Sequence, residues 1–357
     1  MKILTIVGAR PQFIKAAAVS RAINEYDDIH EVIVHTGQHF DESMSDVFFR
    51  EMSIPDVKYN LKINGLTHGA MTGQMLEKIE EVILNEKPDW VLVYGDTNST
   101  LAGALAASKL HVKVAHVEAG LRSFNMRMPE EQNRVLTDRI SSVLFCPTEN
   151  AVENLKSEGF ESLSVKIKNV GDVMFDATRF YEKSIGDKAR VEIDGKYLLV
   201  TCHRAENTDN LDRFKEIILA LNELSKKYKI VFPLHPRTKK VIENNKIKLD
   251  FKPIEPVGYF DMLKLIKNSE FVMTDSGGLQ KEAYFHQKYC LTMRDETEWV
   301  ELIENKVNVL TGACSKKILQ EARRISNLKF NSSTDLYGDG NSADLIIKSL
   351  INLQNYE

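Results

Sequence analysis

The sequence has few cysteines and no long apolar run. Its four cysteines, Cys146, Cys202, Cys290 and Cys314, are far apart, with no Cys-x-x-Cys pair and no histidine at zinc-binding spacing, so we expect free and mostly buried thiols. No apolar run reaches the ~18–20 residues of a membrane-spanning helix, and the chain opens on a charged, strand-like segment instead of a signal peptide. We therefore expect a cytoplasmic protein without membrane insertion.

The sequence also lacks an excess of positive charge and the common nucleotide-binding motifs. Lys and Arg number 47 against 51 Asp and Glu, a formal net charge of −4, which disfavours nucleic acid as a partner but still allows a local basic pocket. Neither Gly-x-Gly-x-x-Gly nor a P-loop Gly-Lys-Ser/Thr occurs, which argues against a dinucleotide oxidoreductase and a P-loop NTPase. His35 and His39 straddle Gly37 at a strand end instead of sharing a helix face, so we expect no metal.

What the sequence does contain is the pattern of a large α/β protein. Its 357 residues are too many for one ordinary core, and short β-branched runs alternate with longer helical stretches throughout, as in parallel βαβ units. A charged, poorly periodic stretch at 181–195 suggests a linker, and an amphipathic pattern predicts a helix over 342–353. We expect domains at 1–175 and 176–340, followed by a C-terminal helix within 341–357. The expected strands are 3–7, 31–35, 90–94, 113–117, 142–145 and 167–170, then 197–201, 229–232, 251–254, 271–274 and 289–293.

Polar residues gather just after the expected strands of the first half, where ligands bind in open parallel sheets. After the first strand, Gly8 permits a tight turn and Pro11 suits a helix start, and a helix N-terminus flanked by Arg10 and Lys15 would attract a phosphate. The alternative is an ordinary turn with two solvated cations. Asp96, which follows the strand expected at 90–94, is either a functional carboxylate or a helix cap.

Three further acidic residues lie at the end of the next strand or after it. Glu118 ends that strand and precedes Gly120, and Glu130 and Glu131 follow Pro129 at a helix start, so up to three carboxylates can meet at one cleft rim. For one of the two adjacent glutamates, favourable charge in a first helical turn is a sufficient explanation. Carboxylates crowded in a partly dry cleft differ in pKa, so one can act as acid and another as base, which is what moving protons on and off carbon requires.

The second half has phosphate-binding candidates at corresponding places. His203 and Arg204 follow one strand and His235 another, where they either neutralise or protonate a leaving phosphate or are structural. The strongest signal is Ser276-Gly277-Gly278 between a strand and a helix that carries Glu282. Its glycines let backbone N–H groups approach a diphosphate, and the carboxylate can accept hydrogen bonds from ribose hydroxyls.

Taken together, these motifs resemble the non-hydrolysing UDP-N-acetylglucosamine 2-epimerases. The match runs in order and at similar spacing through nearly the whole chain, and it is carried by Gly8-x-Arg10-Pro11, Gly95-Asp96-Thr97, His116-Val117-Glu118-Ala119-Gly120-Leu121-Arg122, Pro129-Glu130-Glu131-x-Asn133-Arg134, His203-Arg204-x-Glu206, Asp275-Ser276-Gly277-Gly278-x-Gln280-x-Glu282 and Tyr337-Gly338-Asp339-Gly340. The resemblance implies two Rossmann-like domains in a glycosyltransferase-B-like arrangement, a C-terminal helix that packs back on the first domain, a homodimer, and no cofactor.

The resemblance also implies a reaction. Carbon-2 of a UDP-linked N-acetylated sugar is inverted by eliminating UDP to a 2-acetamidoglucal and adding it back, for surface polysaccharide synthesis. Asp96, Glu118 and Glu130 would be the acid/base candidates, with His203 at the diphosphate. The substrate-binding positions would be Arg10, Lys15, Arg134, Arg204, His235, Ser276, Gly277, Gly278 and Glu282.

The sequence departs from the family pattern in places that bear on the substrate. The usual Thr-Glu-Arg-Pro-Glu reads Thr297-Glu298-Trp299-Val300-Glu301, which loses a cation expected near the ligand. The Gln-His-Arg motif reads Gln38-His39-Phe40-Asp41, and Gln74 replaces an Arg that helps hold an activating second UDP-sugar in bacterial members, so we expect no need for that effector. These segments look more like the branch acting on UDP-2,3-diacetamido-2,3-dideoxy-glucuronate. A hydrolysing epimerase, a glycosyltransferase and a non-catalytic nucleotide-sugar sensor are the alternatives.

Overall fold

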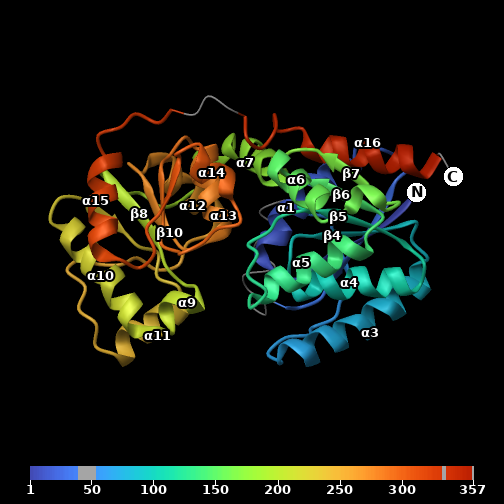
Figure 1. The fold of residues 1–357 in the computed structure, drawn as a ribbon, viewed down its shortest axis with the longest axis horizontal. Coiled ribbons are helices and arrows are strands. Elements are labelled where there is room, and N and C mark those ends of the chain that lie inside the picture. The colour runs from blue at the N-terminus through green and yellow to red at the C-terminus, as the bar shows by residue number, and fades with distance from the viewer. Residues whose placement is uncertain (39–53, 332–334, 356–357) are drawn as a thin grey trace. The chain divides into compact units, whose positions relative to one another are not determined.

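The computed structural model describes residues 1–38, 54–331 and 335–355. The chain divides into two compact units (Figure 1). Unit 1 comprises residues 1–177 together with 335–357, and unit 2 comprises residues 178–334. The division falls inside helix α7 (Val173–Glu182), and the stretch at 181–195 contains the short helix α8 (Ile185–Lys188). Among the described residues, every helix is too short or too polar to cross a bilayer.

Unit 1 is built on a parallel sheet of seven strands in the order β3-β2-β1-β4-β5-β6-β7. Its central strands are mostly apolar and buried, as expected for a sheet covered on both faces. The strands are β1 (Lys2–Val7), β2 (His30–His35), β3 (Val57–Asn60), β4 (Trp90–Tyr94), β5 (Lys113–Val117), β6 (Val143–Cys146) and β7 (Lys166–Asn169).

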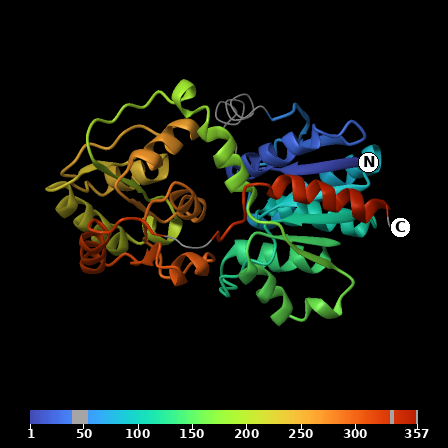
Figure 2. The same cartoon turned by 90° about the horizontal axis from the view of Figure 1, so that it is seen from above.

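The helices of unit 1 cover both faces of this sheet. Helices α3, α4 and α5 pack side by side in one layer, whereas α16 contacts α1 although the two are at opposite ends of the chain (Figures 1 and 2). Helix α16 is held in unit 1 by Ala343 N–H, which donates to Asp176 Oδ2 at 2.7 Å, and by Trp90 Nε1, which donates to Gln354 Oε1 at 3.1 Å. The helices are α1 (Arg10–Ile23), α3 (His68–Glu86), α4 (Asn98–Lys109), α5 (Pro129–Ile140), α6 (Glu149–Ser157), the 3₁₀ turn η1 (Phe160–Ser162) and α16 (Ser342–Asn355).

Unit 2 has a parallel sheet of five strands in the order β12-β11-β10-β8-β9. The strands are β8 (Tyr197–Thr201), β9 (Lys229–Val231), β10 (Val272–Thr274), β11 (Cys290–Thr292) and β12 (Asn308–Leu310). The helices are α9 (Ala205–Thr208), α10 (Leu211–Ser225), α11 (Pro236–Asn244), α12 (Tyr259–Asn268), α13 (Gly277–Phe285), α14 (Val300–Glu304) and α15 (Ser315–Ile325). A core of buried apolar residues lies where α10 and α15 meet the sheet.

The α/β class and nearly all expected strands are confirmed. The strand expected at 251–254 is wrong, because Pro253 has no N–H to donate and only a single bridge forms there, between Pro233 and Ile254. The edge strands β3 and β12 were not expected. All four cysteines are free, and only Cys314 is exposed.

Candidate functional site

The candidate residues of unit 1 meet where β4 and β5 end. The two strands run parallel with Tyr94 opposite Val117, so that the segments which follow them leave the sheet side by side. Gly95 N–H continues this ladder by donating to Val117 O at 2.9 Å. Asp96 on one strand end and Glu118 on the next are therefore brought together at the carboxyl edge of the sheet, the edge at which ligands bind in such folds.

Glu118 is held in an unusual backbone conformation. Its φ of 68° lies in the left-handed region, which costs a non-glycine residue roughly 1–2 kcal/mol. Its N–H donates to Phe145 O at 3.0 Å, and its carboxylate forms an ion pair with Lys15 of α1. A Cβ atom on Gly95 would lie 3.3 Å from Lys15 Nζ and 3.5 Å from Glu118 Oε2, so the ion pair lies directly against the Gly95 turn. Backbone strain of this kind concentrates at functional sites.

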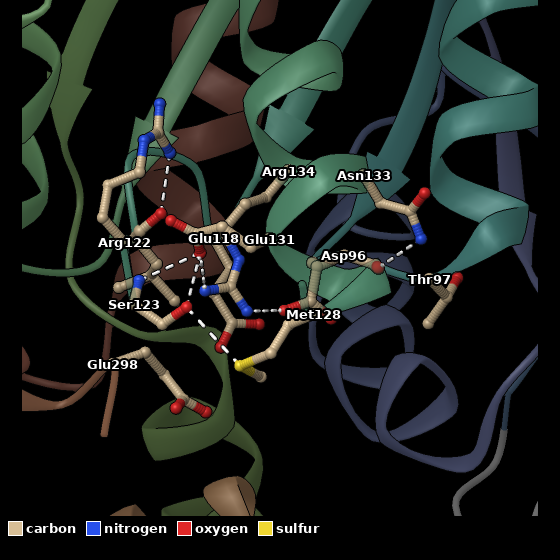
Figure 3. A network of polar contacts seen from close by, with 12 residues as sticks. Asp96, Thr97, Glu118, Arg122, Ser123, Met128, Glu131, Asn133, Arg134 and Glu298 are labelled. Carbon is tan, nitrogen blue, oxygen red and sulfur yellow. Dashed lines mark hydrogen bonds and ion pairs between the residues drawn. The ribbon is translucent and has the colours of Figure 1, made fainter. Parts of the chain in front are cut away.

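Asp96 is held by helix α5. Arg134 donates through Nη2 to Asp96 Oδ2 and through Nη1 to Glu131 Oε2, the latter at 2.8 Å, so that its guanidinium lies between the two carboxylates (Figure 3). Asn133 Nδ2 donates to the backbone oxygen of Asp96 at 3.0 Å. Arg134 is buried, whereas the Asp96 side chain keeps 29% of its surface exposed, enough to meet a ligand.

Glu130 and Glu131 have different surroundings although they are adjacent on α5. Glu131 is buried and accepts hydrogen bonds from Ser123 N (2.9 Å), Ser123 Oγ (3.0 Å) and Phe124 N (2.9 Å) in addition to Arg134. Glu130 is half-buried, and its side chain makes no hydrogen bond or ion pair with any residue that the structure describes. Glu131 therefore stabilises the local structure, and the carboxylate of Glu130 is available for a ligand.

A residue that the sequence did not single out connects the turn between β1 and α1 to this site. Gln12 is buried in α1, accepts from Gly8 N (2.8 Å) and Ala9 N (3.0 Å) through Oε1, and donates to Tyr94 O at 2.9 Å. It thereby fixes the turn that ends at the half-buried Arg10 to the end of β4. Its place directly behind Pro11 in the first turn of α1 was the available signal.

A neighbouring segment is described only in part. Gln38 Oε1 accepts from Ser99 N at 3.1 Å and Ser99 Oγ at 2.7 Å, next to the start of α4. The rest of the motif, His39 to Asp41, lies outside the described residues.

In unit 2, Asp275 organises the phosphate-binding candidates. The strand ends of β8 and β10 are opposite each other, with Thr201 paired to Thr274. Asp275 is fully buried and accepts from the backbone N–H groups of His203 and Arg204, each at 3.0 Å to Oδ2. The His203 side chain also faces this carboxylate, with Nδ1 3.7 Å from Oδ1. A residue named only as part of a motif thus positions two of the predicted ligand-binding residues.

The Ser276-Gly277-Gly278 turn opens helix α13 as expected, with Ser276 at the N-cap. A Cβ atom on Gly277 would lie 2.6 Å from Glu298 Oε1 and 3.6 Å from Arg204 Nη2. Glu298 is itself held by Arg294, whose Nη1 donates to Glu298 Oε2 at 2.8 Å, and both side chains are buried. A side chain at position 277 would therefore displace the Glu298 carboxylate.

Two of the remaining candidates of unit 2 contact each other, and a third lies on α13. The rings of His203 and His235 stack at 5.4 Å, and His235 Nδ1 accepts from Arg237 N at 3.2 Å. Glu282 is buried on α13. The Lys281 ammonium lies 3.9 Å from the centre of the ring of Trp299, the residue that departs from the family pattern.

The candidate residues thus form two groups, one in each unit. The sequence profile of the UDP-N-acetylglucosamine 2-epimerase family matches residues 21–351. A Pseudomonas aeruginosa protein named UDP-2,3-diacetamido-2,3-dideoxy-D-glucuronate 2-epimerase is 55% identical over 354 residues, which cover 99% of this chain and 100% of that protein. A UDP-N-acetylglucosamine 2-epimerase of Methanocaldococcus jannaschii is 46% identical over 369 residues, covering 98% of this chain and 99% of that protein.

A solved structure extends the likeness to the fold. The crystal structure of Methanocaldococcus jannaschii UDP-GlcNAc 2-epimerase in complex with UDP-GlcNAc and UDP matches with a TM-score of 0.92 and 45% identity, covering 99% of this chain and 100% of that one. This match confirms the glycosyltransferase-B-like fold class expected from the sequence. The chain therefore belongs to the UDP-N-acetylglucosamine 2-epimerase family, as its motifs indicated.

Proposed function

We propose that this protein inverts carbon-2 of a UDP-linked N-acetylated sugar without hydrolysing it, by eliminating UDP and adding it back. The observation that carries this proposal is the assembly at the ends of β4 and β5, where Asp96 and Glu118 each pair with a buried cation supplied by a different helix. Such an arrangement provides carboxylates for moving protons and cations for meeting negative charge in one place.

The chemistry explains why such a site is needed. The hydrogen on carbon-2 is not next to a carbonyl group, so it is not acidic enough to be removed directly. When the bond from carbon-1 to the UDP oxygen breaks, the electron pair leaves with UDP and positive charge develops at carbon-1. A carboxylate then takes the carbon-2 proton, and its bonding electrons form the double bond of a 2-acetamidoglucal. In the return step UDP attacks carbon-1 while carbon-2 receives a proton on the opposite face, so no oxidant or reductant is consumed.

The residues divide between these tasks. Asp96, Glu118 and Glu130 are the proposed acid/base groups in unit 1, and the cations Arg10, Lys15 and Arg134 stabilise negative charge near them. In unit 2 the proposed nucleotide site consists of the α13 N-terminus and the residues around it, which would hold the diphosphate and the ribose. Its members are His203, Arg204, His235, Ser276, Gly277, Gly278 and Glu282.

For the substrate, we propose the UDP-2,3-diacetamido-2,3-dideoxy-glucuronate branch, with a role in surface polysaccharide synthesis. The named Pseudomonas relative supports this choice, and so does the Glu298-Trp299 segment, which the sequence linked to the same branch. A homodimer in the cytoplasm stays a prediction, and light scattering on the purified protein tests the oligomeric state.

The test is to incubate the enzyme in heavy water with each candidate substrate. We expect deuterium at carbon-2 and a mixture of the two epimers by NMR, with faster turnover of the diacetamido-glucuronate than of UDP-N-acetylglucosamine. Stoichiometric release of UDP with a free sugar would favour a hydrolysing epimerase, and transfer of sugar to an added acceptor would favour a glycosyltransferase. Binding of both nucleotide sugars without exchange at carbon-2 would favour a sensor and refute the proposal.

A further inference from the structure

A buried histidine connects the two turns that carry Asp96 and Glu118. His116 lies in β5 and has no exposed surface. Its Nε2 is 2.7 Å from the carbonyl oxygen of Gly95, and its Nδ1 is 2.7 Å from Asp138 Oδ1 on α5. A carbonyl oxygen can only accept a hydrogen bond, so Nε2 is the donor in the first contact.

Asp138 reaches the second turn directly. Its Oδ2 accepts from Gly120 N at 3.2 Å and from Arg122 Nη1 at 2.7 Å. Although burial acts to raise the pKa of Asp138, hydrogen bonds and charges from His116 and Arg122 hold it below the ordinary value. The Asp138 carboxylate therefore joins the His116 ring to the Gly120 N–H and to Arg122.

Arg122 extends this chain of contacts to a second carboxylate. Arg122 forms a bidentate ion pair with Glu158, donating through Nε to Oε1 at 2.7 Å and through Nη2 to Oε2 at 2.8 Å. The Arg122 guanidinium thus lies between the carboxylates of Asp138 and Glu158. A buried network is stabilising only when its charges are paired and its donors and acceptors are satisfied, and this one meets both conditions.

We propose that His116 is a positioning residue for the epimerase reaction: held by Asp138, it fixes the Gly95 carbonyl and thereby sets Asp96 relative to Glu118. This inference rests on the proposed function, in which those two carboxylates move the protons. Gly95 has a φ of 62° and no side chain that restrains its backbone. The hydrogen bond to its carbonyl oxygen therefore limits how the turn can move. A displacement of about 1 Å at a reacting group costs on the order of 10²-fold in rate.

Two substitutions of similar size separate the two contacts of the ring. The amide nitrogen of glutamine reaches the position of Nε2, so His116→Gln keeps a donor to Gly95 O and loses the contact with Asp138. The amide nitrogen of asparagine reaches the position of Nδ1, so His116→Asn keeps the contact with Asp138 and loses the one with Gly95. Ile79→Ala, in the buried core of unit 1 away from the site, serves as a control for lowered stability alone.

We expect His116→Asn to lower kcat about 10²-fold and His116→Gln about tenfold or less, with KM and the affinity for UDP within about twofold of wild type in both. Ile79→Ala should lower Tm and leave kcat per folded molecule unchanged. Losses of kcat that follow Tm across all three variants, or an asparagine variant as active as wild type, would overturn the inference and leave the proposed function standing.

Amide exchange supplies a readout that does not depend on turnover. Hydrogen–deuterium exchange of a peptide covering residues 94–98 should be faster in His116→Asn than in wild type and unchanged in His116→Gln. If wild type exchanges nothing at carbon-2 of either substrate, the proposed function fails. In that case the amide data still decide whether His116 holds the turn, and equal exchange rates in the two variants would refute it.

Discussion

The adjacent glutamates of α5 allow one prediction to be worked through in detail. Glu131→Gln replaces a buried carboxylate that receives four hydrogen bonds, whereas Glu130→Gln changes a half-buried side chain that has no partner among the described residues. The first substitution should therefore affect stability, and the second should affect turnover.

The expected size of the stability effect follows from the geometry. Oε2 of Glu131 serves Ser123 N, Ser123 Oγ and Arg134, so the glutamine carbonyl takes that place and the amide group faces the N–H of Phe124, whose hydrogen bond is lost. Losing that bond and the negative charge beside Arg134 costs about 2 kcal/mol. For a domain of this size the loss lowers Tm by roughly 4–8 °C.

Calorimetry and a carbon-2 exchange assay on both variants check this prediction. Glu130→Gln should keep Tm within about 1 °C of wild type, as an isolated substitution at a partly exposed site does, while kcat falls on the order of 10²-fold or more. Glu131→Gln should instead lower Tm by the amount given above and affect kcat less than Glu130→Gln does. A Glu131→Gln protein as stable as wild type, together with a fully active Glu130→Gln protein, would refute both role assignments.

Three further predictions concern unit 2. Asp275→Asn removes the negative charge that holds the His203 backbone, so UDP affinity in calorimetric titration should fall about tenfold, and wild-type affinity would contradict this role. Gly277→Ala should weaken UDP binding by a similar factor because its Cβ displaces Glu298, while the alanine's helix preference of ~1 kcal/mol limits the change in Tm; an unchanged affinity would show that nucleotide does not approach this turn. Burial lowers the pKa of His286 to about 4, so the unfolded chain binds the proton more readily than the folded one. The free energy of unfolding of unit 2 should therefore fall by about 3 kcal/mol as the pH falls from 6.5 to 4. Denaturant unfolding of His286→Gln should lack this decrease, and an equal decrease in that variant would contradict the assignment.

The sequence was informative wherever a local pattern determines the structure. Apolar β-branched runs predicted the buried strands, and strand ends predicted where Asp96 and Glu118 would lie. The edge strands β3 and β12 were missed because short strands at a sheet edge lack the continuous apolar character of central ones. The strand expected at 251–254 does not form, although the segment has apolar character, because Pro253 has no N–H to donate.

The supporting residues could not be found in this way. Gln12, Asp138 and Arg294 are buried polar residues whose partners come from other elements or from the far side of a loop. In sequence each resembles any polar residue of a helix or loop, and only tertiary structure supplies its hydrogen-bond partners. The choice between Glu130 and Glu131 was open for the same reason, since both suit the first turn of a helix and only packing places one of them inside.

The strained backbone at Glu118 explains why so many contacts converge on this edge of the sheet. A glycine at this position would adopt the same φ without strain, so a carboxylate is retained at a cost of roughly 1–2 kcal/mol. The ion pair with Lys15, the contacts of the Glu118 and Ala119 N–H groups with Phe145 O, and the hold of Asp138 on Gly120 together offset that cost. Since the left-handed turn sends the Glu118 side chain toward Gly95 and Asp96, relaxing it would separate the two carboxylates that the proposed proton transfers require. The buried network of His116, Asp138 and Arg122 is thus energetically required to hold Asp96 and Glu118 in place.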